Sequence, residues 1–116
     1  MTRVQEREEA FRAVYALSFG DGGDVSHLVA DSFSKTLYEA TVANLGEIDE
    51  KIKAAIKHDF EKIYKVDLAL LRLGIAEMVF VAETPKPIVI SSIMDMAKKY
   101  STEGSAKFLN GVLGSV

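Results

Sequence analysis

One stretch of the chain, residues 66–82, carries apolar side chains in every direction around a helical period. Its only charged residues are Asp67, Arg72 and Glu77. A helix that is apolar all round is normally buried among other elements. A membrane span is excluded because Arg72 and Glu77 would lie near the bilayer centre, where a charge is very unfavourable. We therefore predict a central core helix with Asp67 as its N-terminal cap, and a structural partner for each of the two buried charges.

The segments before this stretch show the spacing of amphipathic helices, with apolar residues every three or four positions. Residues that suit helix ends divide them: Thr2 with Gln5 as a capping box, Ser26 and Asp49 as N-caps, and Gly46 as a C-cap. These signals predict a first helix that ends at the glycine-rich run of residues 20–24. They also predict a second segment over residues 26–45, as one helix or two, and a third that begins at Asp49.

The two prolines at positions 85 and 87 are predicted to end the central helix, because proline has no amide donor and disfavours helix in the residue before it. Pro87 suits the first turn of a further helix. A polar break at residues 101–105 separates that helix from the last one, which carries Phe108 and Leu113. No stretch alternates convincingly with a two-residue period. The pattern predicts an all-α fold of six or seven short helices, in a single domain over residues 1–116.

The composition is that of an ordinary globular protein, with 116 residues, 48% of them hydrophobic and 27% charged. The absence of cysteine excludes disulfides and thiolate–metal sites. A net charge of −3 argues against a generally basic nucleic-acid binder, but it is compatible with a local basic patch. The N-terminus has no apolar signal segment, so we expect a cytoplasmic protein without membrane contact.

Motifs of the common catalytic sites are missing from the sequence, including phosphate-binding glycine loops, nucleophile elbows and Rossmann fingerprints. The run at residues 20–24 has no preceding strand and no lysine, so it is interpreted as a connector. His27 and His58 are too few for a metal cluster and lie where exposed or capping histidines are common. We therefore expect no enzymatic activity, no cofactor and no metal.

Four blocks of sequence agree in order and approximate spacing with one known family. The run VDLALLRLGIAEM at residues 66–78 is similar to a VDRAILRLAVYEL signature, and KFLNGVL at residues 107–113 is similar to a closing KFVNGVL motif. AVY at residues 13–15 matches an Ala-Leu-Tyr of the first helix, and residues 87–100 resemble a P-x-x-V-x-I…ELAKKF/Y helix. Through these blocks the chain resembles NusB, the family of bacterial transcription antitermination factors.

The resemblance implies two small helical bundles packed around the central buried helix, without enzymatic activity. Members of the family bind the boxA element of ribosomal RNA transcripts as a complex with NusE, which is also a small-subunit ribosomal protein. That complex joins RNA polymerase and suppresses premature termination. Single-stranded RNA is bound by positive charges that contact phosphates and by aromatic faces that stack on bases.

Matching motif positions imply a set of RNA-binding residues in this chain: Arg3, Arg7, Tyr15, Lys107, Phe108 and Asn110. The resemblance also places Asp67, at the start of the central helix, near the surface for NusE and RNA.

Packing roles compete with these assignments. Tyr15 and Phe108 also fit the apolar stripes of their helices, and Asn110 suits a cap or a buried hydrogen bond. Arg7 and Lys107 are interpreted as exposed helix charges, a kind of residue that is usually only solvated.

The sequence departs from the family mainly on the expected binding surface. Residues 1–12 hold three arginines against three glutamates, where the family has a basic run. Each lost phosphate contact removes part of the salt-dependent affinity. Glu103-Gly104-Ser105 replaces the family's Glu-Asp-Ser, and Ser91-Ser92 replaces its Asn/Asp-Glu pair.

Three functions stay open at this point. The first is an RNA-binding antitermination factor that works with NusE. The second is a helical protein–protein module that binds NusE or forms a homodimer, with weak or no RNA binding. The third is the NusB-like domain at the front of some RNA methyltransferases, which the absence of a cofactor-binding segment disfavours.

Overall fold

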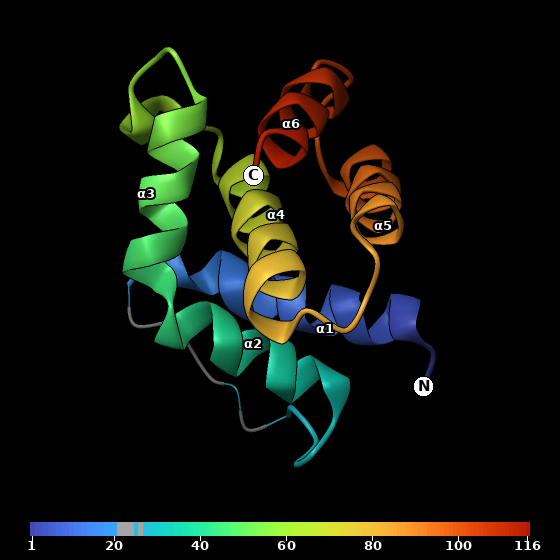
Figure 1. The fold of residues 1–116 in the computed structure, drawn as a ribbon. Coiled ribbons are helices and arrows are strands. Elements are labelled where there is room, and N and C mark those ends of the chain that lie inside the picture. Colours follow the sequence, from blue (N-terminus) through green and yellow to red (C-terminus); the bar gives the residue numbers. More distant parts are fainter. Residues whose placement is uncertain (21–24, 26) are drawn as a thin grey trace.

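A computed structural model describes residues 1–20, 25 and 27–116, and all of its regular elements are helical (Figure 1). The six α-helices in this part of the chain are α1 (Arg3–Leu17), α2 (Phe33–Ala43), α3 (Leu45–Ala55), α4 (Lys65–Ile75), α5 (Lys86–Tyr100) and α6 (Ser105–Gly114). A 3₁₀ turn, η1 (Phe60–Lys62), precedes α4, and a π-helix, η2 (Ala76–Val81), continues it. The predicted all-α fold is confirmed.

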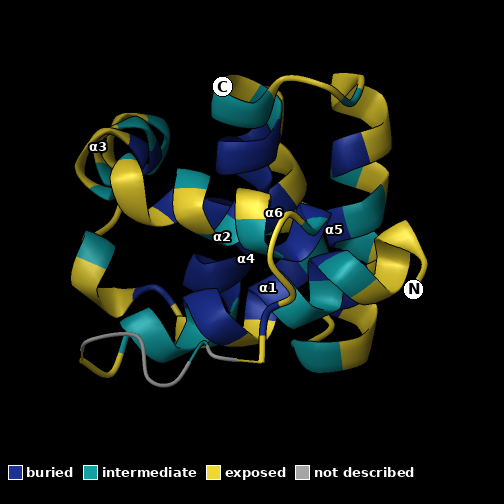
Figure 2. Cartoon of the chain, turned by 90° about the horizontal axis from the view of Figure 1, so that it is seen from below, coloured by how far each residue is buried: buried dark blue, intermediate teal, exposed yellow. Residues whose placement is uncertain are grey.

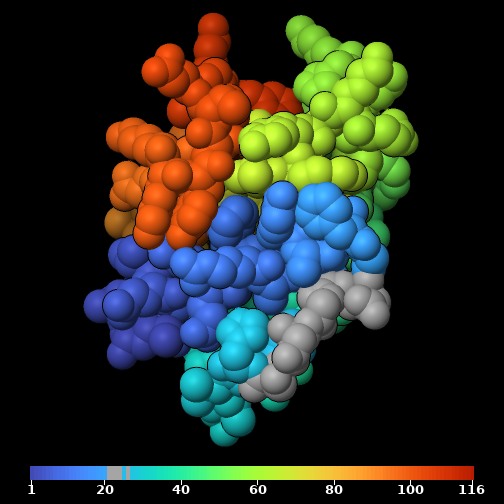
Figure 3. Space-filling model, turned by 180° about the vertical axis from the view of Figure 1, so that it is seen from behind, coloured from blue at the N-terminus to red at the C-terminus, as the bar shows by residue number. Residues whose placement is uncertain are grey.

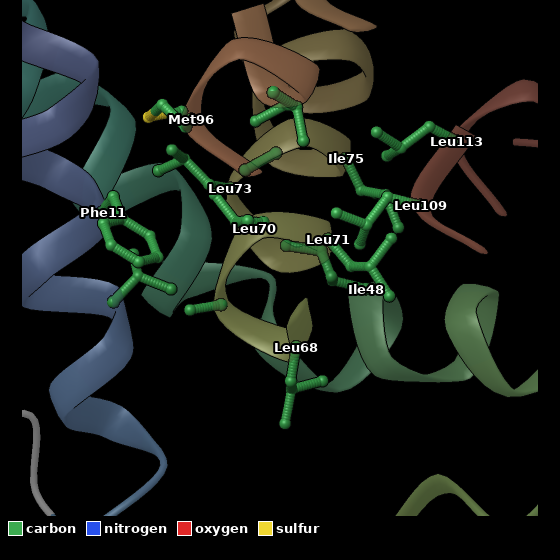
Figure 4. Packing of buried hydrophobic residues seen from close by; sticks show 14 of the residues in the cluster. Phe11, Ile48, Leu68, Leu70, Leu71, Leu73, Ile75, Met96, Leu109 and Leu113 are labelled. Carbon is green, nitrogen blue, oxygen red and sulfur yellow. The ribbon is translucent and has the colours of Figure 1, made fainter. Parts of the chain in front are cut away.

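The predicted central helix is formed by α4 together with η2, and every residue from Asp67 to Glu77 is buried. It packs against α1 and α2 as one bundle and against α5 and α6 as the other, with α3 alongside. Figure 4 shows Phe11, Ile48, Met96 and Leu109 around the leucines of α4. Figure 2 shows that buried residues follow the inner sides of the surrounding helices. Each fully buried leucine contributes about 1.5–3 kcal/mol.

None of the helices in the described residues combines the length and the apolar character that crossing a bilayer takes. Gly74 explains how α4 can lie so close to both α5 and α6. A Cβ at this position would be 3.1 Å from Ile93 Cγ1 and 3.1 Å from Leu113 Cδ2, which is tighter than ordinary packing.

The start of α1 confirms the predicted capping box. The backbone N–H of Thr2 donates to Gln5 Oε1 at 2.8 Å, and the N–H of Gln5 donates to Thr2 Oγ1 at 3.1 Å. Residues 21–24 of the glycine-rich run and the predicted cap Ser26 lie outside the described residues. The next helix begins at α2, where the Ser32 side chain accepts an N–H of the first turn.

Three other predicted helix ends are wrong. Only one residue separates α2 from α3, so Gly46 and Asp49 lie inside α3. Asp67 is the third residue of α4 and makes no cap. Both aspartates instead bind partners from other helices, because a tertiary hydrogen bond satisfies a carboxylate as well as a helix end does. Pro87 is in the first turn of α5, as predicted.

The two charges of the central helix both have the partners that their burial requires. Arg72 Nε and Nη2 donate to Asp49 Oδ1 and Oδ2 at 2.9 and 2.8 Å. Arg7 Nε and Nη2 donate to Glu77 Oε1 and Oε2 at 2.8 and 2.7 Å. Glu77 is fully buried. These bidentate pairs fix α3 and α1 to the central helix.

The central helix ends in strained backbone. In the π-helix, the Ala82 N–H donates to the Glu77 carbonyl at 2.9 Å, a bond from residue i+5 to residue i. Ala82 then adopts a left-handed conformation with φ of 56°. Non-glycine residues rarely occupy this region, because Cβ crowds the backbone there.

Candidate functional site

Arg7 lies inside the protein, so the expectation of an exposed charge at this position is wrong. It is 6% exposed, and its hydrogen bonds to Glu77 raise the pKa of its guanidinium, against the lowering effect of burial. Arg7 precedes Ala10, Phe11 and Val14 at helical spacing, and all four residues are on the buried side of α1. That spacing is the signal in the sequence that places Arg7 on the inner face.

Arg3 is on the first turn of α1, about 18 Å from Tyr15 at the rise of 1.5 Å per residue. Its guanidinium carbon is 3.9 Å from the centroid of the Phe33 ring, and its Nη1 is 3.5 Å from Glu6 Oε1. Arg3 therefore covers the contact between α1 and α2, where the Arg7 guanidinium also lies 5.6 Å from the centroid of the same Phe33 ring.

Tyr15 belongs to a row of four aromatic rings along α1 and the end of α5. Ring centroids are 5.1 Å apart for Tyr100 and Phe11, 6.2 Å for Phe11 and Tyr15, and 5.0 Å for Tyr15 and Phe19. Phe11 is buried, Tyr15 is half-buried and Phe19 is 65% exposed. The row leads from the core to the surface at the end of α1, a part of the chain that lies below η1 and the start of α4 in Figure 3. Tyr15 therefore combines packing with partial exposure.

The carboxylate of Glu8 lies beside this row and pairs with two cations, Lys99 and Arg12. It accepts from Lys99 Nζ at 3.0 and 3.1 Å and from the Tyr100 hydroxyl at 3.2 Å, and Arg12 Nη2 lies 3.9 Å away. The hydrogen bond from Lys99, aided by that from Tyr100, lowers the pKa of Glu8. The same contact raises the pKa of Lys99. The local neutralisation expected of residues 1–12 therefore takes the form of ion pairs in the structure.

Lys107 and Phe108 are at the start of α6, and both line a surface groove. Lys107 is exposed, and Phe108 is half-buried with its ring centroid 5.5 Å from that of His58. Asn110 is also exposed, so the expectation of a buried hydrogen bond is wrong, and it lines none of the cavities beside Phe108.

Asp67 joins the central helix to the start of α6. It is 7% exposed, and its carboxylate accepts from the hydroxyls of Ser101 and Ser105, the latter at 2.9 Å. Asp67 and Phe108 line one surface cavity of about 240 Å³, together with Tyr64. The sequence marked the two serines only as part of a polar break, because nothing in their spacing shows the carboxylate that they bind. Through the serines, Asp67 therefore ties the start of α6, which carries Phe108, to the central helix.

The structure thus brings together Lys107, Phe108 and Asp67 around two adjoining cavities. Tyr15 belongs to the aromatic row of α1, and Arg3, Arg7 and Asn110 line neither cavity. Within the described part of the chain there is no group of three or more histidine, cysteine or acidic residues that could hold a metal ion.

Comparisons with known proteins agree with this fold. The model of the NusB family matches residues 4–116. Transcription antitermination protein NusB of Sulfurimonas denitrificans is 33% identical over 127 residues, which cover 99% of this chain and 96% of that relative. NusB of Finegoldia magna is 31% identical, with coverage of 100% and 93%.

Solved structures give the same result. A crystal structure of the antitermination factors NusB and NusE in complex with double-stranded RNA matches with a TM-score of 0.83 and 27% identity, over 99% of this chain and 96% of that one. T. maritima NusB matches with a TM-score of 0.85 and 25% identity, over 99% and 89%. The chain belongs to the NusB family of non-enzymatic transcription antitermination factors.

Proposed function

We propose that this protein binds single-stranded, boxA-like RNA together with the small-subunit ribosomal protein NusE, and that the complex acts with RNA polymerase to suppress termination in ribosomal RNA transcription. The observation that carries the proposal is the exposed cation and half-buried aromatic ring at the start of α6, Lys107 and Phe108, in a chain of the NusB family. A related NusB has been crystallised with NusE and double-stranded RNA.

In this proposal, Lys107 contacts RNA phosphates, and Phe108 offers its ring to a base. Tyr15 and the exposed Phe19 extend the aromatic surface over the end of α1. Asp67 acts as a positioning residue, because both of its carboxylate oxygens already accept hydrogen bonds from serines. Arg7 is left out of the RNA surface, because its donors are bound to Glu77.

A second candidate function is a protein–protein module that binds NusE, or a second copy of itself, with little RNA affinity. The burial of Arg7 against Glu77 favours this second function. The ion pairs of Arg12 and Lys99 with Glu8 favour it as well. Each cation that is paired within the protein removes one candidate phosphate contact.

A titration of labelled boxA-like RNA at low salt, with and without NusE, separates the two functions. The first predicts RNA binding that NusE tightens, and the second predicts tight NusE binding that RNA leaves unchanged. Absence of RNA binding in both arms would reject the first function. Light scattering of the protein alone tests self-association.

A further inference from the structure

A groove separates the end of α3 from α6, and residues 55–58 line its α3 side. Its volume is about 650 Å³, and its lining includes Lys57, His58, Gly104, Lys107, Phe108 and Gly111. Figure 3 shows a notch at its upper edge, between the orange-red start of α6 and the green residues that end α3. None of the resemblances in sequence points to Lys57 or His58, which come from the opposite wall to the KFLNGVL motif.

The groove is basic although the chain is acidic overall. Its ionisable side chains are Lys57, His58 and Lys107, and its lining contains no carboxylate. Among the described residues, neither lysine makes an ion pair, in contrast to Lys99 and the arginines at positions 7 and 72. Uncompensated positive charge on both walls of a concave surface attracts an anionic ligand.

The groove also offers aromatic surface with open space beside it. The rings of His58 and Phe108 pack with a tilt of 48° and a centroid separation of 5.5 Å. Gly104 and Gly111 carry no side chain, and a Cβ at either position would meet nothing within 4 Å. Cations along a groove with exposed ring faces are the features that bind single-stranded nucleic acid. The volume lies in the range of about 300–1,000 Å³ that is typical of ligand sites.

The groove adjoins the surface already assigned to RNA. His58, Gly104 and Phe108 line both this groove and the cavity over Asp67. We propose that single-stranded RNA bound at Phe108 continues into the α3–α6 groove, where Lys57 and Lys107 contact its phosphates and a base stacks on His58 and Phe108. This inference rests on the proposed function, and it assigns Lys57 and His58 as further RNA-binding residues.

Fluorescence anisotropy with two RNAs tests the inference, in the presence of NusE and over a range of KCl concentrations. One RNA is a minimal boxA-like strand, and the other is the same strand with four more nucleotides at each end. The wild type should bind the longer RNA about fivefold more tightly. Lys57→Ala should weaken binding of the longer RNA about threefold. It should also reduce the slope of log affinity against log salt concentration by about 0.7, the value for one phosphate of a single strand. The short RNA should bind this variant and the wild type equally.

Matched variants separate contact from structural damage. Lys53→Ala removes the same charge from an exposed position on α3 outside the groove, and it should leave both affinities and the salt slope unchanged. His58→Ala should weaken binding of the longer RNA about fivefold, whereas His58→Phe should retain it, because stacking takes any aromatic face.

Equal behaviour of Lys57→Ala and Lys53→Ala on the longer RNA would overturn the groove assignment, and binding of the short RNA would leave the proposed function standing. Failure of the wild type to bind either RNA would overturn both. Binding of an acidic peptide in the groove, seen as shifts of the Gly104 and Gly111 amide resonances that RNA does not produce, would also overturn the RNA assignment.

Discussion

The sequence does not distinguish the basic residues of α1 from those of the α3–α6 groove, but the two sets have different surroundings in the structure. The arginines of α1 at positions 3, 7 and 12 all lie beside a glutamate carboxylate. In the groove, Lys57 and Lys107 line the same open space, together with glycines and the rings of His58 and Phe108. The difference indicates that α1 uses its cations largely to hold the fold, whereas the groove has cations available for a ligand.

The physical origin of this difference is the environment of each helix. The inner face of α1 packs on the central helix, where the cation of Arg7 needs a charged partner because an unpaired buried charge is very unfavourable. Lys57 and Lys107 remain hydrated at an open rim, so they need no partner to be stable. Predictions for four variants test this contrast, from the largest effect to the smallest.

Arg7→Ala should lower the free energy of unfolding by about 3–5 kcal/mol, because it leaves the carboxylate of Glu77 buried without a partner. Urea denaturation followed by circular dichroism measures this loss. The double variant Arg7→Met with Glu77→Leu should recover most of it, since removal of both charges leaves no uncompensated ion. A loss below 1 kcal/mol for Arg7→Ala would show that the Arg7–Glu77 ion pair does not fix α1 to the central helix.

Lys107→Ala should reduce the affinity for boxA-like RNA about fivefold, equivalent to about 1 kcal/mol, and it should leave the urea midpoint within error of the wild type. Lys98→Ala, a matched change at an exposed position on α5, should alter neither quantity. Titrations at two salt concentrations check the result. Equal RNA affinity of the Lys107 variant and the wild type would remove α6 from the RNA surface.

Ala82→Gly should stabilise the protein by about 0.5–1 kcal/mol, because glycine adopts the left-handed φ of 56° without a Cβ clash. The effect is confined to the end of the central helix where Arg7 pairs with Glu77, so RNA affinity should not change. Thermal denaturation measures the gain, and Glu83→Gly, at the adjacent exposed position, is the control that should not raise the midpoint.

Glu8→Gln should cost only about 0.3 kcal/mol at pH 7, because the ion pair with Lys99 is largely screened by solvent. The contacts that lower the pKa of Glu8 stabilise the folded protein at pH values above 4.5, the ordinary pKa of a glutamate. This contribution is lost as the pH falls through the lowered pKa. The stability difference between the variant and the wild type should therefore vanish in acid. A difference that persists at pH 2 would contradict this origin.

The same variant sharpens the contrast between the two regions. Loss of one negative charge and release of Lys99 and Arg12 should raise RNA affinity about twofold at low salt, and the increase should disappear at high salt. A decrease in affinity would mean that Glu8 holds these cations in a binding geometry.

The sequence predicted the fold well because periodic patterns specify helices locally. The all-round apolar run at residues 66–82, the capping box at Thr2 and the turn before α5 all appear where expected. Predictions of Asp49 and Asp67 as helix caps failed because a cap and a tertiary ion pair or hydrogen bond use the same carboxylate. Nothing within a few residues of either aspartate shows which partner is nearer in space.

The sequence by itself determined the all-helical fold, the central helix and the family, since these depend on local periodicity and on motif letters. Only the tertiary structure decided which cations are paired within the protein and which are available for a ligand. It paired Arg7 with Glu77, 70 residues away, and it placed Lys57 opposite Lys107 across one groove. The reason is physical: a helix pattern depends on neighbours three or four residues apart, whereas ion pairing and exposure depend on what the rest of the chain brings to the same place.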